Sequence, residues 1–88
     1  MTWRIEFEDK ALKELTNLNP ATQRRIVRYL RERIASADNP RLLGTPLKGQ
    51  LAEYWRYRVG NYRILCNIHD AALTVLVIRV AHRGKVYR

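Results

Sequence analysis

Arginines and tyrosines alternate along the second half of the chain, and three of the arginines lie close to Gly60: Arg56, Arg58 and Arg63. An arginine guanidinium binds phosphate oxygens through a planar fork and stays charged at any working pH. Aromatic rings interleaved with such cations can stack on unpaired bases. The alternative is a solvated strand face, but the single sign of the charge favours an anionic partner, and RNA suits both residue types.

The same residues could also cut RNA. Attack of a ribose 2′-hydroxyl on its own 3′-phosphate needs a base, cations that stabilise the added negative charge, and an acid that protonates the leaving oxygen. Arg56, Arg63 and Arg83 suit the stabilisation of charge. They are poor proton donors, because the pKa of arginine lies above ~12. A domain with the arginines alone would bind RNA without cleaving it.

Two residues near the end of the sequence are candidate proton carriers, His82 and Tyr87. Histidine has a suitable unperturbed pKa, although a lone histidine near a strand end is as often a surface residue. Tyr87 would need its pKa, normally ~10, lowered by surrounding arginines. Its ring could instead fold back over apolar residues of the sheet. Glu53 is the only acid near the first strand of the arginine segment, which makes a carboxylate base a poor candidate.

These side chains must be positioned by a hairpin, because Gly60-Asn61 separates two alternating runs and predicts a two-residue turn. The turn sets the strand register: Val59 opposite Tyr62, Arg58 opposite Arg63, Tyr57 opposite Ile64, and Arg56 opposite Leu65. Since side chains alternate across a strand, one face is predicted to be apolar: Trp55, Tyr57, Val59, Tyr62, Ile64, Cys66 and Ile68. The opposite face holds the arginines: Tyr54, Arg56, Arg58, Arg63, Leu65 and Asn67.

The first half of the chain predicts three elements: a half-buried strand over residues 3–7, a helix over 9–16, and a second helix over 20–35. Asp9 is predicted to cap the first helix. Asn19 is predicted to cap the second, with Pro20 at its first position. Residues 38–53 are broken by proline and glycine and predict an irregular connection.

The last strand is predicted over residues 73–80, which are almost all apolar, so its register is ambiguous by one residue. We prefer the register that keeps Arg79 away from the helices, which places three other residues against them: Leu76, Ile78 and Val80. That register leaves an apolar set on the arginine face, beside Leu65: Leu73, Val75 and Val77. Such a set would need a cover, from a partner or from the C-terminal tail.

The predicted fold is a single α+β domain over residues 1–88, with the element order β-α-α-β-β-β. A two-helix hairpin packs on one face of a four-stranded, mainly antiparallel sheet that includes the N-terminal strand. The first strand could lie at an edge or pair beside the last strand, and the pattern does not choose between these positions.

The net charge of +9 over 88 residues suggests nucleic acid, an acidic protein or an anionic membrane surface as partner. No apolar run approaches the ~20 residues of a membrane span, and the N-terminus lacks the pattern of a secretory signal. The lone Cys66 reads as a small buried hydrophobe in a reducing cytosol, so a cytoplasmic protein is expected. The scattered His, Cys and acidic residues lack metal-ligand spacing, and neither metal nor cofactor is expected.

Four segments in this order resemble the RelE/ParE toxin superfamily, and within it the RelE-like mRNA interferases: FEDKALKELTNLNP, PLKG, YRVGNYRIL and RVAHRGKVY. The resemblance covers essentially the whole chain. It implies a toxin that enters the ribosomal A site and cleaves mRNA there, with a cognate antitoxin as partner and no need for a metal. The family's arginine after the turn falls on Arg63, the arginine of the closing strand on Arg83, and the C-terminal tyrosine on Tyr87.

The chain departs from the family's best-known member where that protein has two lysines before the turn, because those positions are Tyr54 and Arg56 here. Arginine keeps the charge but is a worse base, so the general base is left open. The predicted catalytic residues are Arg56, Arg63, Arg83 and Tyr87, and the predicted RNA-binding residues are Lys48, Tyr54, Arg58, His82 and Lys85. Two alternatives remain at this point: a ParE-like toxin that inhibits DNA gyrase, and a catalytically weak RNA-binding toxin.

Overall fold

The computed structural model describes residues 2–83, which form a five-stranded sheet with two helices. The elements in chain order are β1 (Arg4–Phe7), α1 (Asp9–Thr16), α2 (Pro20–Tyr29), a π-helical turn (Leu30–Ile34), a 3-10 turn (Pro40–Leu43), β2 (Thr45–Pro46), a second 3-10 turn (Gly49–Leu51), β3 (Tyr54–Val59), β4 (Tyr62–His69) and β5 (Thr74–His82). The α+β prediction is confirmed. The sheet has one strand more than predicted, because Thr45 and Pro46 pair with β3.

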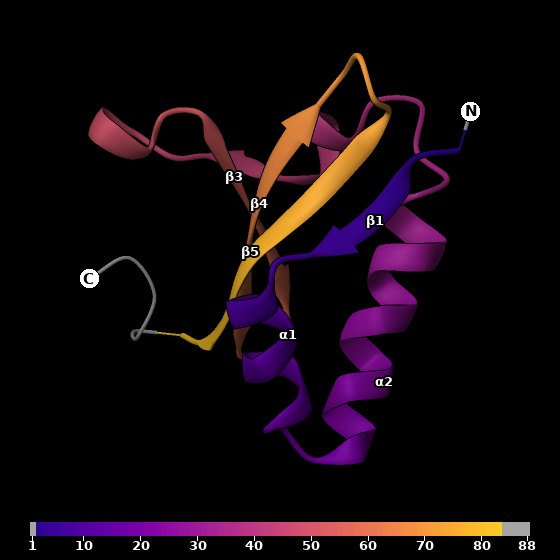
Figure 1. The fold of residues 1–88 in the computed structure, drawn as a ribbon, viewed down its shortest axis with the longest axis vertical. Helices are drawn as coiled ribbons and strands as arrows, with labels where there is room; N and C mark the ends of the chain where they lie inside the picture. Colours follow the sequence, from indigo (N-terminus) through magenta and orange to yellow (C-terminus); the bar gives the residue numbers. More distant parts are fainter. Residues whose placement is uncertain (1, 84–88) are drawn as a thin grey trace.

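The strand order in the sheet is β1-β5-β4-β3-β2, and Figure 1 shows α1 and α2 as neighbours joined by a short connection. The position of the first strand, which the sequence left open, combines both alternatives: β1 is an edge strand and it pairs with the last strand, β5, in parallel. All other pairs are antiparallel. The long strands β4 and β5 therefore form the centre of the sheet.

Both helices begin near the predicted residues. The Asn19 side chain accepts a hydrogen bond of 2.9 Å from the Thr22 amide, and Pro20 is the first helical residue, as predicted. The prediction of Asp9 as a cap was wrong by one residue, since Glu8 is the N-cap, without a side-chain hydrogen bond, and Asp9 lies in the first turn. The π-helical turn extends α2 to Ile34, close to the predicted end.

The core lies between the helices and one face of the sheet. Its helical residues recur at four-residue steps within each helix and are Ala11, Leu15, Ile26, Leu30 and Ile34. The sheet contributes Tyr57, Val59, Ile64, Cys66, Ile68, Val75, Val77 and Val80. Most of the face predicted to be apolar in β3 and β4 is thus buried under the helices, and Trp55 and Tyr62 pack against its margin.

The predicted register of β5 was wrong over its first half. Leu65 lies opposite Arg79, as the preferred register requires, but Cys66 lies opposite Val77, so Ile78 is an extra residue in a β-bulge. A bulge shifts the alternation by one, which turns Val75 and Val77 as well as Val80 toward the helices. The valines of both halves of the strand face the helices in this way, while Arg79 stays on the other side, opposite Leu65. The uncovered set predicted on the arginine face does not exist, and Leu76 and Ile78 are only half-buried.

The helix α1 covers the edge of β5 that β1 leaves open. The carboxylate of Glu14 accepts a hydrogen bond of 2.8 Å from the Val80 amide, and it binds the Arg79 guanidinium at 3.0 Å. The side chains of both residues are about three-quarters buried, with 23% and 25% exposed. One acid therefore satisfies a free strand amide and neutralises the arginine beside it.

We expect Glu14→Ala to lower the free energy of unfolding by roughly 1–2 kcal/mol, because it removes a charged acceptor from a partly buried amide and guanidinium. Glu14→Gln keeps an acceptor for the Val80 amide and should lose less. Urea denaturation of both variants beside the wild type measures the difference. Equal midpoints for Glu14→Ala and the wild type would contradict this account of the edge.

Candidate functional site

The hairpin that carries the arginines has the predicted register at all four predicted pairs, from Arg56 opposite Leu65 to Val59 opposite Tyr62. Gly60 has φ 59°, and Asn61 is not among the residues with positive φ, which matches a type II′ turn. We call the side of β3 and β4 opposite the helices the arginine face. It carries Tyr54, Arg56, Arg58, Arg63, Leu65 and Asn67.

The charges on the arginine face lie close together. Arg58 and Arg63 are direct cross-strand partners, and Arg56 is two residues from Arg58 on the same side of β3. Arg56 and Arg63 are half-buried, whereas Arg58 is exposed. Each guanidinium group of this face can bind anionic oxygens through its planar fork. The arrangement is therefore suited to a group with several anionic oxygens, such as a phosphodiester.

Arg83 follows β5 and lies beside the hairpin turn. Its backbone amide donates a hydrogen bond of 2.7 Å to the Asn61 carbonyl, which continues the β4–β5 ladder by one step. Alternation along the strand places Arg83 on the side of Ala81, the partner of Arg63. The structure thus brings Arg56, Arg63 and Arg83 toward the same side of the sheet, from three separate strands or strand ends.

His82 lies on the other side. It is the partner of Tyr62, whose side of the sheet faces the helices, and the two rings meet edge to face with centroids 5.3 Å apart. Its Nδ1 lies 3.1 Å from the Arg83 carbonyl oxygen, within hydrogen-bond distance. His82 is exposed, but the register does not bring it to the arginine face.

The remaining predicted residues are placed as follows. Tyr54 is half-buried at the start of β3, on the side of Arg56, and Leu65 forms an apolar part of the same face with 4% exposure. Lys48 is exposed, and the Leu47 amide before it donates to the Tyr54 carbonyl, which brings this segment to the start of β3. Lys85 and Tyr87 lie outside the described residues.

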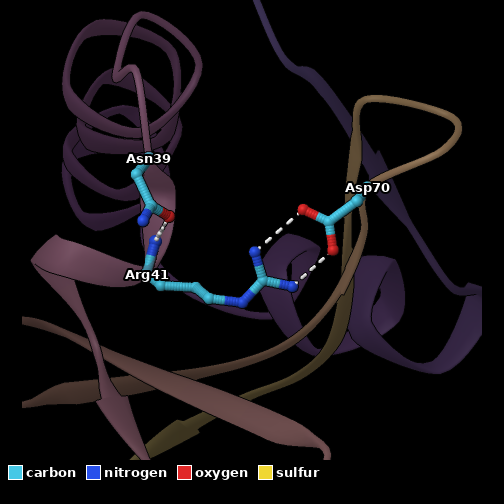
Figure 2. A network of polar contacts seen from close by, with 3 residues as sticks. All are labelled: Asn39, Arg41 and Asp70. Carbon is cyan, nitrogen blue, oxygen red and sulfur yellow. Dashed lines mark hydrogen bonds and ion pairs between the residues drawn. The ribbon is translucent and has the colours of Figure 1, made fainter.

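An exposed ion pair fixes the connection that leads to Lys48 and β2. Figure 2 shows the Arg41 guanidinium beside both carboxylate oxygens of Asp70, to which its Nη1 and Nη2 atoms donate hydrogen bonds of 2.9 and 2.6 Å. The Asn39 side chain accepts a further hydrogen bond from the Arg41 backbone amide. This bidentate pair ties the first 3-10 turn to the turn between β4 and β5. The hydrogen bond from Arg41 lowers the pKa of Asp70 below its ordinary value.

We expect Asp70→Asn to lower the melting temperature slightly at neutral pH and to have no effect in acid. A lowered folded-state pKa stabilises the fold above the ordinary pKa of 3.8, and the stabilisation is lost as pH falls through the folded-state value. Because the pair is exposed, the effect is small. Thermal melts of both proteins between neutral pH and about pH 2.5 measure it. A difference that stays constant down to the lowest pH would contradict the assignment.

One contact near the turn was missed from the sequence. The Arg25 guanidinium of α2 lies against Gly60, where an added Cβ would be only 2.9 Å from its Nη1 atom. The arginines of α2 read as an ordinary solvated helix face, and no local pattern reveals that one of them reaches the hairpin. Only the packing of α2 beside the turn brings the two segments together.

Two classes of site are absent from residues 2–83. No helix in this part of the chain is long and apolar enough to cross a membrane. Within the same residues, no group of three or more His, Cys, Asp or Glu side chains is arranged to hold a metal ion. The single cysteine, Cys66, is fully buried, which raises the pKa of its thiol and keeps it from acting as a nucleophile.

Comparison with known proteins places this geometry among toxins. Residues 5–87 match the family described as ParE toxin of type II toxin–antitoxin system, parDE. The toxin RelG of Mycobacterium tuberculosis is 32% identical over 88 residues, which span 100% of this chain and 99% of that protein. The toxin RelE of the same organism is 35% identical over 78 residues, covering 77% and 80%. The RelBE2 toxin–antitoxin complex from this bacterium contains a chain that superposes with a TM-score of 0.86 at 29% identity, covering 97% and 95%.

Proposed function

This chain belongs to the ParE toxin family of type II toxin–antitoxin systems, and we propose that it is a ribosome-dependent endoribonuclease that cleaves mRNA in the A site. Relatives over most or all of the chain are named toxins RelG and RelE, and the motifs of this chain resemble those of the RelE-like mRNA interferases. The observation that carries the proposal is the arginine face, where Arg58 and Arg63 are cross-strand partners beside Arg56. Guanidinium groups gathered on one face suit a ligand with several anionic oxygens.

In the proposed reaction, the 2′-hydroxyl of one nucleotide attacks its own 3′-phosphate, so no metal is required. Arg56, Arg63 and Arg83 bind the phosphate oxygens and stabilise the extra negative charge as the P–O bond to the next nucleotide breaks. Tyr87 is the proposed acid that protonates the leaving oxygen. Leu65 lies between these arginines and keeps part of the face apolar, which strengthens their interaction with charge.

RNA beyond the reacting phosphate is proposed to contact the margins of this face. Lys48, Arg58 and Lys85 supply charge, and the half-buried ring of Tyr54 supplies a surface for a base. His82 could contact RNA only from the helix side of the sheet, next to Tyr62. No side chain is assigned as the general base that removes the proton from the 2′-hydroxyl, because tyrosine and arginine, the residue types at positions 54 and 56, are both weak bases at neutral pH.

The proposed partners are the ribosome with its mRNA and a cognate antitoxin, and the proposed location is the cytoplasm, where translating ribosomes are found. The antitoxin follows from the relatives, since RelBE2 is a toxin–antitoxin complex. Inhibition of DNA gyrase is the second candidate function, because the matching family carries the name of ParE. Gyrase inhibition would leave the clustered arginines without a chemical role.

Primer extension on mRNA from translating ribosomes separates the two functions. The proposal predicts new 5′ ends within A-site codons after the purified protein is added, and no DNA breaks with gyrase. Gyrase-linked DNA breaks together with intact mRNA would overturn the proposal in favour of the second function. Binding to RNA without cleavage of either nucleic acid would leave only a catalytically weak toxin.

A further inference from the structure

A groove that adjoins the arginine face, and shares Arg58 with it, runs between α2 and the hairpin turn. Its volume is about 400 Å³, and its lining comes from α2, the π-helical turn and the end of β3: Arg25, Arg28, Tyr29, Glu32, Arg33, Arg58, Val59 and Gly60. We call it the basic groove. Of these lining residues, the proposed cleavage of mRNA uses Arg58 alone, as a contact to RNA.

The basic groove holds four guanidinium groups and one carboxylate. None of the four arginines forms an ion pair with a carboxylate of residues 2–83. The helical segment that forms one wall, residues 20–34, has five arginines and no lysine. One arginine guanidinium can donate two parallel hydrogen bonds to two oxygens of a phosphate, whereas a lysine ammonium has no planar fork and acts as a point charge. The groove is thus suited to several phosphates rather than to a single carboxylate.

The contact between Arg25 and Gly60 joins the two walls of the groove, α2 and the hairpin turn. Any side chain at position 60 would displace the Arg25 guanidinium, because a Cβ there would lie 2.9 Å from Nη1. Gly60 also has φ 59°, which its hairpin turn requires. The same glycine therefore shapes the turn and admits the arginine. Arg58, which lines the groove, is also the cross-strand partner of Arg63, so the groove adjoins the arginine face.

The lining distinguishes RNA from a protein as the occupant. Protein interfaces have an apolar centre in which charged residues are depleted, whereas interfaces with nucleic acids are more polar and strongly positive. The apolar residue of this groove offers little surface to a partner, because Val59 is buried in the core with only 5% exposed. The ring of Tyr29 is half-buried and tilted against Tyr57, with centroids 6.4 Å apart.

The same comparison distinguishes a duplex from a single strand. Proteins hold unpaired strands largely by stacking bases on exposed aromatic rings. The one aromatic ring in the lining of the basic groove, Tyr29, is half-buried and packs against Tyr57, so the guanidinium groups make up most of the surface that the groove offers. Double-helical RNA is recognised mainly through phosphates and 2′-hydroxyls, which guanidinium groups alone can contact.

We propose that the basic groove docks the phosphate backbone of double-helical RNA, while the arginine face holds the unpaired strand that is cut. This inference deepens the proposed function, since a ribosome-dependent nuclease must dock on folded RNA around its substrate. Arg58 joins the two surfaces, so a docked duplex sets the position of the scissile strand. In this arrangement the basic groove recognises the shape of the duplex, and the arginine face carries out the cleavage.

The test uses fluorescence anisotropy with a labelled RNA hairpin and a labelled unpaired RNA of equal length. The double variant Arg28→Ala/Arg33→Ala should weaken binding to the RNA hairpin about tenfold or more. It should also make the slope of the logarithm of the binding constant against the logarithm of the salt concentration shallower by about 1–2. Lys10→Ala/Lys13→Ala removes the same charge from exposed positions of α1 and should change affinity less than about twofold. Alanine suits exposed helical positions, and thermal melts check that both variants fold.

Equal losses for the two double variants would overturn the proposal, because the effect would then reflect net charge alone. A larger loss for the unpaired RNA than for the hairpin would also overturn it. A groove variant that binds both RNAs normally but fails to bind a co-expressed antitoxin would assign the groove to a protein partner. Failure of the wild type to cleave mRNA on ribosomes would sink the proposed function and leave this binding result standing.

Discussion

Replacing Arg63 with alanine is expected to lower the rate of mRNA cleavage on translating ribosomes by about 10²–10³-fold, the usual cost of removing one group that stabilises charge in a transition state. Arg63 lies in the centre of the arginine face, with Arg58 as its partner on one side and Ala81 on the other. It is half-buried, so it acts on the phosphate through less water than an exposed arginine would. A single-turnover time course on stalled ribosomes measures the rate.

Arg4→Ala is the matched control, because it removes one arginine from β1, at the far edge of the sheet. Its side chain is 72% exposed and, within residues 2–83, forms an ion pair with Glu6 alone, so the variant should fold and cleave like the wild type. Arg63→Lys, which keeps the charge but loses the planar fork, should fall between the two. Cleavage by Arg63→Ala at the rate of Arg4→Ala would remove Arg63 from the site.

Tyr57→Ala is expected to give the largest loss of stability, about 3–5 kcal/mol of unfolding free energy. Tyr57 is completely buried in the middle of β3, and its hydroxyl donates a hydrogen bond of 2.8 Å to the Pro40 carbonyl. The ring also fills the space beside Gly44, where an added Cβ would be 2.9 Å from its Cε1 atom. Since a domain of this size has about 5–15 kcal/mol in total, much of its stability depends on this side chain.

Tyr57→Phe separates the ring from its hydroxyl. It keeps the packing against Gly44 and should cost only about 1–2 kcal/mol, from the Pro40 carbonyl that loses its buried donor. Urea denaturation with equal slopes for the three proteins gives both values. A Tyr57→Ala midpoint close to that of Tyr57→Phe would show that the ring is not a packing centre of the core.

The hairpin was predictable because its information is local. A two-residue turn at Gly60 leaves no freedom in the pairing that follows, and the alternation of Tyr57 and Arg58 then decides which face is buried. The start of α2 is equally local, since Asn19 and Pro20 satisfy the first turn by themselves. The arginine face therefore followed from residue order alone.

The bulge in β5 was not predictable in the same way. An apolar run has no alternation, so the sequence allowed only a choice between two regular registers. The structure uses both, one on each side of Ile78, because this buries Val77 and Val80 and still leaves Arg79 to meet Glu14. The bulge depends on contacts with the helices that pack against the strand, and the sequence of the strand alone does not reveal those contacts.

The two-residue strand β2 and the basic groove depend on tertiary packing in the same sense. Thr45 and Pro46 are too short a segment to show a strand pattern, and their pairing with β3 depends on how the connection around them folds. The arginines of α2 form a groove only where the hairpin turn approaches them. The proposed roles of Tyr87 and Lys85 still rest on sequence, because these residues lie outside the described range.

The account as a whole rests on a phosphodiester held by the arginine face and attacked by its neighbouring 2′-hydroxyl. Ribosomes programmed with a synthetic mRNA that has a single 2′-deoxynucleotide at the cleaved position of the A-site codon test this most directly. The account predicts that cleavage at that position disappears, while an all-ribose mRNA is cut at the same codon. Cleavage of both messages at equal rates would contradict it.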